Sequence, residues 1–119
     1  MTMTPETPAL PNLGEVRQDT ALAIALAGHG RAHGELVAAL RQRLCGYIRD
    51  MAPTVRDWAA LLPDESRRAQ VVTTVGQAME IAEGRHKGLS DPAEALRLIA
   101  RGADILARFT SSATQGIVR

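Results

Sequence analysis

The chain has 119 residues and a formal net charge of +1 at pH 7, too even a balance for the basic surface of a nucleic-acid-binding or membrane-surface protein. Hydrophobic residues make up 45% of it and aromatic residues only 3%, so we expect a core of aliphatic side chains, as in closely packed helices. One cysteine leaves no intrachain disulfide, and no apolar run reaches the roughly 20 residues of a membrane span, so we expect a cytoplasmic protein.

The N-terminal region changes from a proline-rich lead to a helix at residue 12. Residues 1–11 contain three prolines and no secretory signal pattern, so we expect a disordered lead. Asn12 and Glu15 have the spacing of a capping box, in which two side chains bond to the unpaired amides of the first helical turn. The pattern predicts a helix from Asn12 to about Ala27.

The second half of this helix, TALAIALA, is apolar around most of its circumference. Leu22, Ile24 and Leu26 cannot share one face, because successive residues of a helix point in different directions. Such a surface requires two partners, either two neighbouring helices or a second subunit.

The next segment, GHGRAHG, is interpreted as an exposed linker. His29 and His33 have the i, i+4 spacing with which two histidines on a helix bind a metal, but the glycines around them disfavour a helix there. Glu83 and His86 form a single Glu-x-x-His pair, whereas di-iron bundles use two. We therefore expect no metal and no cofactor.

The strongest periodic signal follows and predicts a long second helix over residues 34–62. Apolar residues recur there at intervals of three and four: Val37, Leu40, Leu44, Ile48, Met51, Val55, Trp58 and Leu62. Pro53 lies inside this helix. Its missing amide and the clash of its ring with the carbonyl four residues back predict a kink or a short break.

A third helix is predicted to begin at Pro63-Asp64-Glu65, because acidic groups there meet the positive end of the helix dipole. It should end near Glu83, where Gly84 is a stop signal. The residues expected to be buried are Val72, Val75, Met79 and Ala82.

The fourth helix has the clearest start signal, with Asp91 as the cap, Pro92 at the first helical position and Glu94 completing a capping box. It should end near Thr110, and residues 113–119 should form a flexible tail. The predicted inner stripe consists of Leu96, Ile99, Ala103, Leu106 and Phe109.

These elements predict an all-α fold, an up-down antiparallel four-helix bundle over residues 12–112 with a long, Pro-kinked second helix. No alternating apolar pattern bounded by turn signals predicts a strand. The loop between the third and fourth helices is too long for a helix-turn-helix and both helices carry balanced charge, so we expect no nucleic-acid partner.

Two polar features allow a chemical as well as a structural interpretation. Cys45 would be a nucleophile if another helix brought a base such as His86 to it, but a lone cysteine on an apolar helix is usually a small buried hydrophobe. The dipeptide Arg-Asp occurs at residues 49–50 and again at 56–57. This repeat is typical either of a solvated helix face or of an arginine rim that binds an acidic ligand or partner.

The stretch LCGYIRDMAPTVRDWAALLPDESRR, residues 44–68, resembles a family of small actinobacterial helical proteins of unknown molecular function, often labelled natural-product biosynthesis proteins. The similarity rests on Tyr47 and Ile48, on Pro53 followed by Val55, on the junction from Leu62 to Glu65, and on a Leu-Ala-Arg helix from Leu98 to Arg108. It extends over about residues 14–112. The resemblance implies a setting in secondary metabolism and carries over no catalytic residue.

Two hypotheses of function follow. The first is a non-catalytic accessory or regulatory protein that acts through protein–protein contacts, as a homodimer or with another protein, because the first helix is over-apolar and no polar constellation suits an active site. The alternative is a small pathway enzyme or a ligand-binding bundle with a metabolite pocket near Pro53. The residues expected to line that pocket are Tyr47, Arg49, Asp50 and Trp58.

Overall fold

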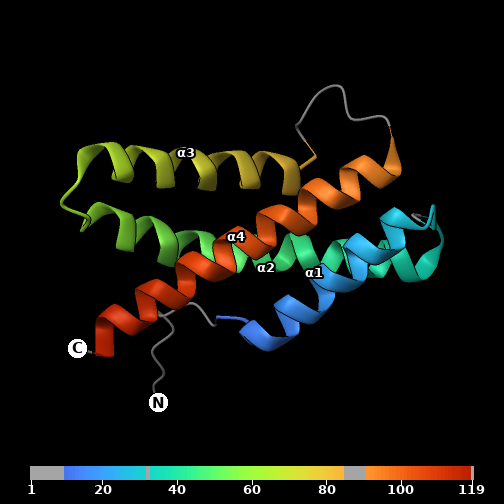
Figure 1. Ribbon diagram of the computed structural model, residues 1–119, viewed down its shortest axis with the longest axis horizontal. Helices are drawn as coiled ribbons and strands as arrows, with labels where there is room; N and C mark the ends of the chain where they lie inside the picture. The colour runs from blue at the N-terminus through green and yellow to red at the C-terminus, as the bar shows by residue number, and fades with distance from the viewer. Residues whose placement is uncertain (1–9, 32, 85–90, 119) are drawn as a thin grey trace, which may run out of the picture.

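The computed structural model describes residues 10–31, 33–84 and 91–118, which form four α-helices and no strand (Figure 1). The helices are α1 (Leu13–Gly28), α2 (Glu35–Ala60), α3 (Glu65–Ala82) and α4 (Pro92–Val118). Successive helices run in opposite directions, so the predicted all-α, up-down fold is confirmed. Most of the N-terminal lead predicted over residues 1–11 lies outside the described residues.

The two long helices, α2 and α4, form the centre of the bundle. They cross and pack against each other, while α3 lies against both on one side and α1 lies against both on the other (Figure 1). Within the described ranges α1 and α3 do not touch. The arrangement therefore differs from a square bundle, because one diagonal pair is in contact and the other is not. Within the described part of the chain, α1 is therefore covered on its inner side only.

The starts of α1, α3 and α4 and the end of α3 follow the predicted signals. Asn12, Asp64 and Asp91 cap α1, α3 and α4, and each side chain accepts a hydrogen bond from a backbone N–H of the first turn. Gly84 follows the end of α3 with φ of +73°, in the left-handed region where glycine is favoured because it has no Cβ. Capping thus determines where α1, α3 and α4 begin, and glycine chemistry determines where α3 ends.

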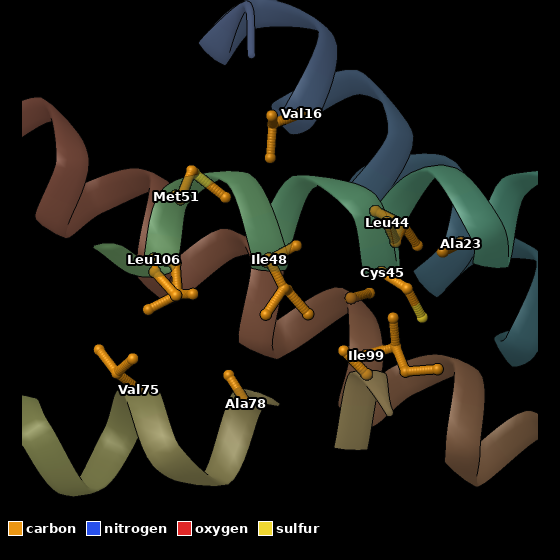
Figure 2. Packing of buried hydrophobic residues seen from close by; sticks show 14 of the residues in the cluster. Val16, Ala23, Leu44, Cys45, Ile48, Met51, Val75, Ala78, Ile99 and Leu106 are labelled. Carbon is orange, nitrogen blue, oxygen red and sulfur yellow. The ribbon is translucent and has the colours of Figure 1, made fainter. Parts of the chain in front are cut away.

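The core is aliphatic, as the composition predicts. The largest fully buried side chains are Leu40, Leu44, Ile48, Met51, Leu96, Leu106, Val16, Val55, Val71, Val75 and Thr110. Figure 2 shows Ile48 pointing from α2 towards α3, where Ala78 lies. At the same level Gly102 lets α4 approach closely, since a Cβ at Gly102 would lie 3.3 Å from Ala78 Cβ and 3.5 Å from Ile48 Cδ1. Three helices therefore meet where a larger side chain has no room.

The buried stripe of α3 differs from the predicted one. Val72 is 49% exposed, so its prediction as a core residue is wrong, and Met79 is half-buried. The residues that α3 buries are Val71, Val75, Ala78 and Ala82. Val71 and Val72 are equally apolar and point about 100° apart, so only the positions of α2 and α4 decide which of the two is covered.

The fourth helix is longer than predicted, because it continues to Val118 instead of ending near Thr110. The described part of the expected C-terminal tail, residues 113–118, is therefore helical. Ala113 in this extension is buried, and Thr114 Oγ1 donates a hydrogen bond to the carbonyl oxygen of Thr110 at 3.0 Å. Between Thr110 and Gly116 no glycine or proline stops the helix, and the burial of Ala113 stabilises the added turns.

The second helix runs without interruption through Pro53, whose ring is exposed. A break at this position is therefore absent, while a kink stays a prediction. The apolar stripe of α2 is confirmed, since its six aliphatic members from Val37 to Val55 are buried and Trp58 and Leu62 pack half-buried against them. None of α1 to α4 combines the length and the apolar character that crossing a bilayer requires.

Candidate functional site

The four residues predicted to line a pocket near Pro53 lie in different settings. The Tyr47 hydroxyl donates a hydrogen bond to Asp19 of α1, and the Trp58 ring packs against Phe109 of α4 with 5.8 Å between centroids. Arg49 lies beside a surface hollow with Cys45, and Asp50 is exposed. Residues 47, 49 and 50 of one helix point in three directions, so no single pocket gathers them.

A polar cluster ties α1 to α2. Asp19 accepts hydrogen bonds from Arg43 Nε and Nη2, both at 3.1 Å, and from the Tyr47 hydroxyl at 2.6 Å. Arg43 and Tyr47 are one turn apart on α2, so both reach the same carboxylate. The guanidinium hydrogen bond lowers the pKa of Asp19 below its ordinary value, and burial raises the pKa of Tyr47 to about 12, helped by its bond to the Asp19 carboxylate.

Tyr47 is the only tyrosine, so its titration is directly observable. We expect a pKa of about 12 in the folded protein and about 10 in the unfolded chain. Because the folded state holds this proton more tightly, the stabilisation is complete below pH 10 and is lost as the pH rises through 12. In Asp19→Asn the pKa should fall but remain above 10, since burial persists.

The ultraviolet absorbance of the phenolate measures both values, with and without urea. Asp50→Asn is the matched control, because Asp50 is exposed and bonds to none of the described side chains, and it should leave the Tyr47 titration unchanged. Equal pKa values of Tyr47 in the folded and unfolded protein would contradict both its burial and its bond to Asp19.

A second feature is a hollow of about 210 Å³ where α2, α3 and α4 meet, which we call the Cys45 hollow. Its lining residues are Arg41, Cys45, Ile81, Ala82, Gly84, Ala95 and Ile99. An adjoining hollow of about 360 Å³ shares Arg41, Cys45 and Ala82 and adds Gln42 and Arg49. Arg41, Cys45 and Arg49 share one side of α2, because they follow one another at four-residue spacing. Arg43 and Tyr47, which hold Asp19, are offset from them by two residues and so lie on the opposite side of α2.

The Cys45 hollow is cationic at its rim and apolar in its walls. Arg41 Nε is buried and has no hydrogen-bond partner among the described residues. Burial raises the pKa of the Cys45 thiol, and the charges of Arg49 and Arg41 oppose this shift. Cys45 is 9% exposed, as expected of a small buried hydrophobe.

A third feature is the outer face of α1, which we define by Ala21, Leu22, Ile24 and Ala25. Leu22 is 40% and Ile24 45% exposed, although both are large aliphatic residues. The inner side of α1 is occupied by Val16, Thr20, Ala23 and Ala27. The stretch from Thr20 to Gly28 carries no charged side chain, so this face is apolar and uncharged.

The predicted linker between α1 and α2 is exposed at both His29 and His33. In residues 10–31, 33–84 and 91–118, no three His, Cys, Asp or Glu side chains are close enough to hold a metal ion. His86, the second member of the Glu-x-x-His pair, lies outside these ranges.

Sequence reasoning did not single out Asp19 or Arg41. Asp19 is 24 residues from Arg43, and no local pattern joins them. The four-residue spacing of Arg41, Cys45 and Arg49 is a visible signal that these side chains share one face of a helix.

The fold and these surfaces define a small all-α four-helix protein. No protein-family model, no curated protein and no solved structure matches its sequence. The resemblance to a natural-product biosynthesis family therefore stays a prediction that rests on the residues that carry it.

Proposed function

We propose that this chain is a non-catalytic accessory or regulatory protein that acts through protein–protein contacts, with the outer face of α1 as its contact surface. The observation that supports this proposal is the exposure of Leu22 and Ile24 on a helix whose inner side already packs on α2 and α4. Exposed apolar surface of this kind marks interaction sites. The secondary-metabolism setting implied by the resemblance belongs to the same proposal.

The partner that fits this face is a second copy of the chain. Ala21 and Ala25 lie one turn apart in its middle, where small side chains let two helix axes approach, and Leu22 and Ile24 flank them on either side. A two-fold axis through this face places two identical apolar surfaces together. Two-fold symmetry is the commonest symmetry of soluble oligomers. No charge on the stretch from Thr20 to Gly28 opposes the contact.

The face is short, so the dimer should be weak. A stable interface buries about 1,200–2,000 Å² in total, which two turns of one helix do not supply. We therefore expect a dissociation constant of about 10–100 μM, corresponding to roughly 5–7 kcal/mol of binding free energy.

Sedimentation velocity between about 5 μM and 500 μM, a range that brackets this constant, tests the proposal. The wild type should shift from monomer to dimer, and Ala25→Arg should remain a monomer because two like charges would meet near the two-fold axis. Ala60→Arg, at another exposed alanine and at the C-terminal end of α2, is the matched control and should dimerise like the wild type. A wild type that stays monomeric, or an Ala25→Arg variant that still dimerises, would refute the proposed surface.

A further inference from the structure

We infer that the Cys45 hollow binds a small organic anion, a carboxylate that carries a short apolar chain. This binding site is separate from the outer face of α1 and does not depend on the proposed function. It joins a cationic rim on α2 to apolar walls contributed by α3 and α4.

One donor of the cationic rim has no partner among the described residues. A guanidinium keeps its charge at all physiological pH values and presents its donors in a planar fork that matches a carboxylate. Arg43 in this protein already uses Nε and Nη2 in this way towards Asp19. The Nε of Arg41 is buried beside the hollow and has no partner among the described residues. A buried donor of this kind is normally paired, so it favours an acceptor that a rotation of the Arg41 side chain would bring within reach, since Nε is closed to solvent in this conformation.

The surrounding charges favour an anion. Arg49 lines the adjoining hollow two turns after Arg41 on the same side of α2, and no Asp or Glu is among the described residues that line either hollow. The two arginines therefore give the two adjoining hollows a positive rim, and Gln42 adds a neutral polar group to it.

The aliphatic walls of the hollow favour an anion that carries an apolar chain. Ile81, Ala95 and Ile99 are aliphatic, and the hollow of about 210 Å³ corresponds to the volume of roughly seven water molecules. A chain of about six to eight carbons fits this space, and its burial against aliphatic walls is favourable. A short fatty acid matches both the charge and the size, whereas a bare inorganic anion would leave the apolar walls unused.

Cys45 is the only cysteine, so its alkylation by iodoacetamide reports on occupation of the hollow. With octanoate as the probe, we expect a saturating concentration to slow the alkylation of Cys45 by about tenfold at constant pH. Octanol has the same chain without the charge, so half-maximal protection of Cys45 should require a concentration at least tenfold higher than with octanoate. Calorimetric titration of octanoate gives the dissociation constant independently of the thiol.

The matched variants are Arg41→Met, which keeps an unbranched side chain and removes the guanidinium, and Arg56→Met, which makes the same change on an exposed part of α2. Arg41→Met should weaken octanoate binding at least tenfold, and Arg56→Met should bind like the wild type. Absence of octanoate binding, equal protection by octanol, or equal binding by the two variants would each overturn the inference. Because Ala25→Arg leaves the hollow intact, it should bind octanoate normally even as a monomer.

Discussion

Replacing Ile48 by alanine is expected to lower the free energy of unfolding by about 2–5 kcal/mol, the largest effect of any substitution considered. Ile48 is fully buried at the level where α2, α3 and α4 meet, and its Cδ1 lies against the Gly102 position of α4. Removal of its outer carbons leaves a cavity that three helices share, so no single helix can move to fill it. Urea unfolding followed by the fluorescence of Trp58, the only tryptophan, measures the change.

Two further substitutions make this prediction specific. Ile48→Val removes one methylene and should cost about 0.5–1.5 kcal/mol. Leu36→Ala removes an apolar side chain that is 64% exposed and should change stability by less than about 0.5 kcal/mol. A similar loss for Leu36→Ala and Ile48→Ala would show that the core is not centred on Ile48.

Replacing Gly102 by valine is expected to cost about 1–3 kcal/mol through overpacking. A Cβ alone would stand 3.3 Å from Ala78 Cβ and 3.5 Å from Ile48 Cδ1, and the two additional methyl groups of valine have no space beyond it. The helices would have to separate, which reduces contact throughout the core. The same urea unfolding experiment gives the magnitude.

The control for this prediction is Gly102→Ala. Alanine gains about 1 kcal/mol of helix propensity over glycine, which offsets the small shift that the tight contact with Ala78 demands, so the net change should be close to zero. Ala78→Gly by itself costs about 1 kcal/mol of helix propensity, but it removes the nearest methyl group, so the double variant with Gly102→Val should lose less stability than the sum of the two single changes. Full stability of Gly102→Val alone would mean that α3 and α4 are not in close contact at this level.

Helix existence and helix starts were predictable because their causes are local. Asn12, Asp64 and Asp91 act within one turn of their own backbone, and the glycine after α3 needs no distant partner. Long periodic stripes, as in α2, were equally predictable, since a single apolar face of this length has one way to be buried.

The stripe of α3 and the end of α4 were not predictable in this way. Val71 and Val72 have the same side chain and differ only in direction, so the positions of α2 and α4 decide which of the two is buried. The extension of α4 to Val118 depends on the burial of Ala113, which the polar residues around it conceal in the sequence.

The candidate sites depend even more on long-range packing. Tyr47, Arg49 and Trp58 are close in sequence, but Asp19, Cys45 and Phe109 lie beside them in space, each through a different face of α2. Proximity along one helix therefore predicted a common pocket that the fold does not make.

The amino-acid sequence by itself determined that this protein is all-helical, where its helices begin, and that its core is aliphatic, because capping, propensity and periodic apolar burial act over a few residues. Only the tertiary structure decided that α2 and α4 touch across the diagonal, that no described residue covers the outer face of α1, and that Arg41 Nε lies beside an apolar hollow without a hydrogen-bond partner among the described residues. These outcomes depend on how helices distant in sequence pack against one another. That packing reflects the summed fit of many small contacts, such as the approach at Gly102, and no local pattern encodes it.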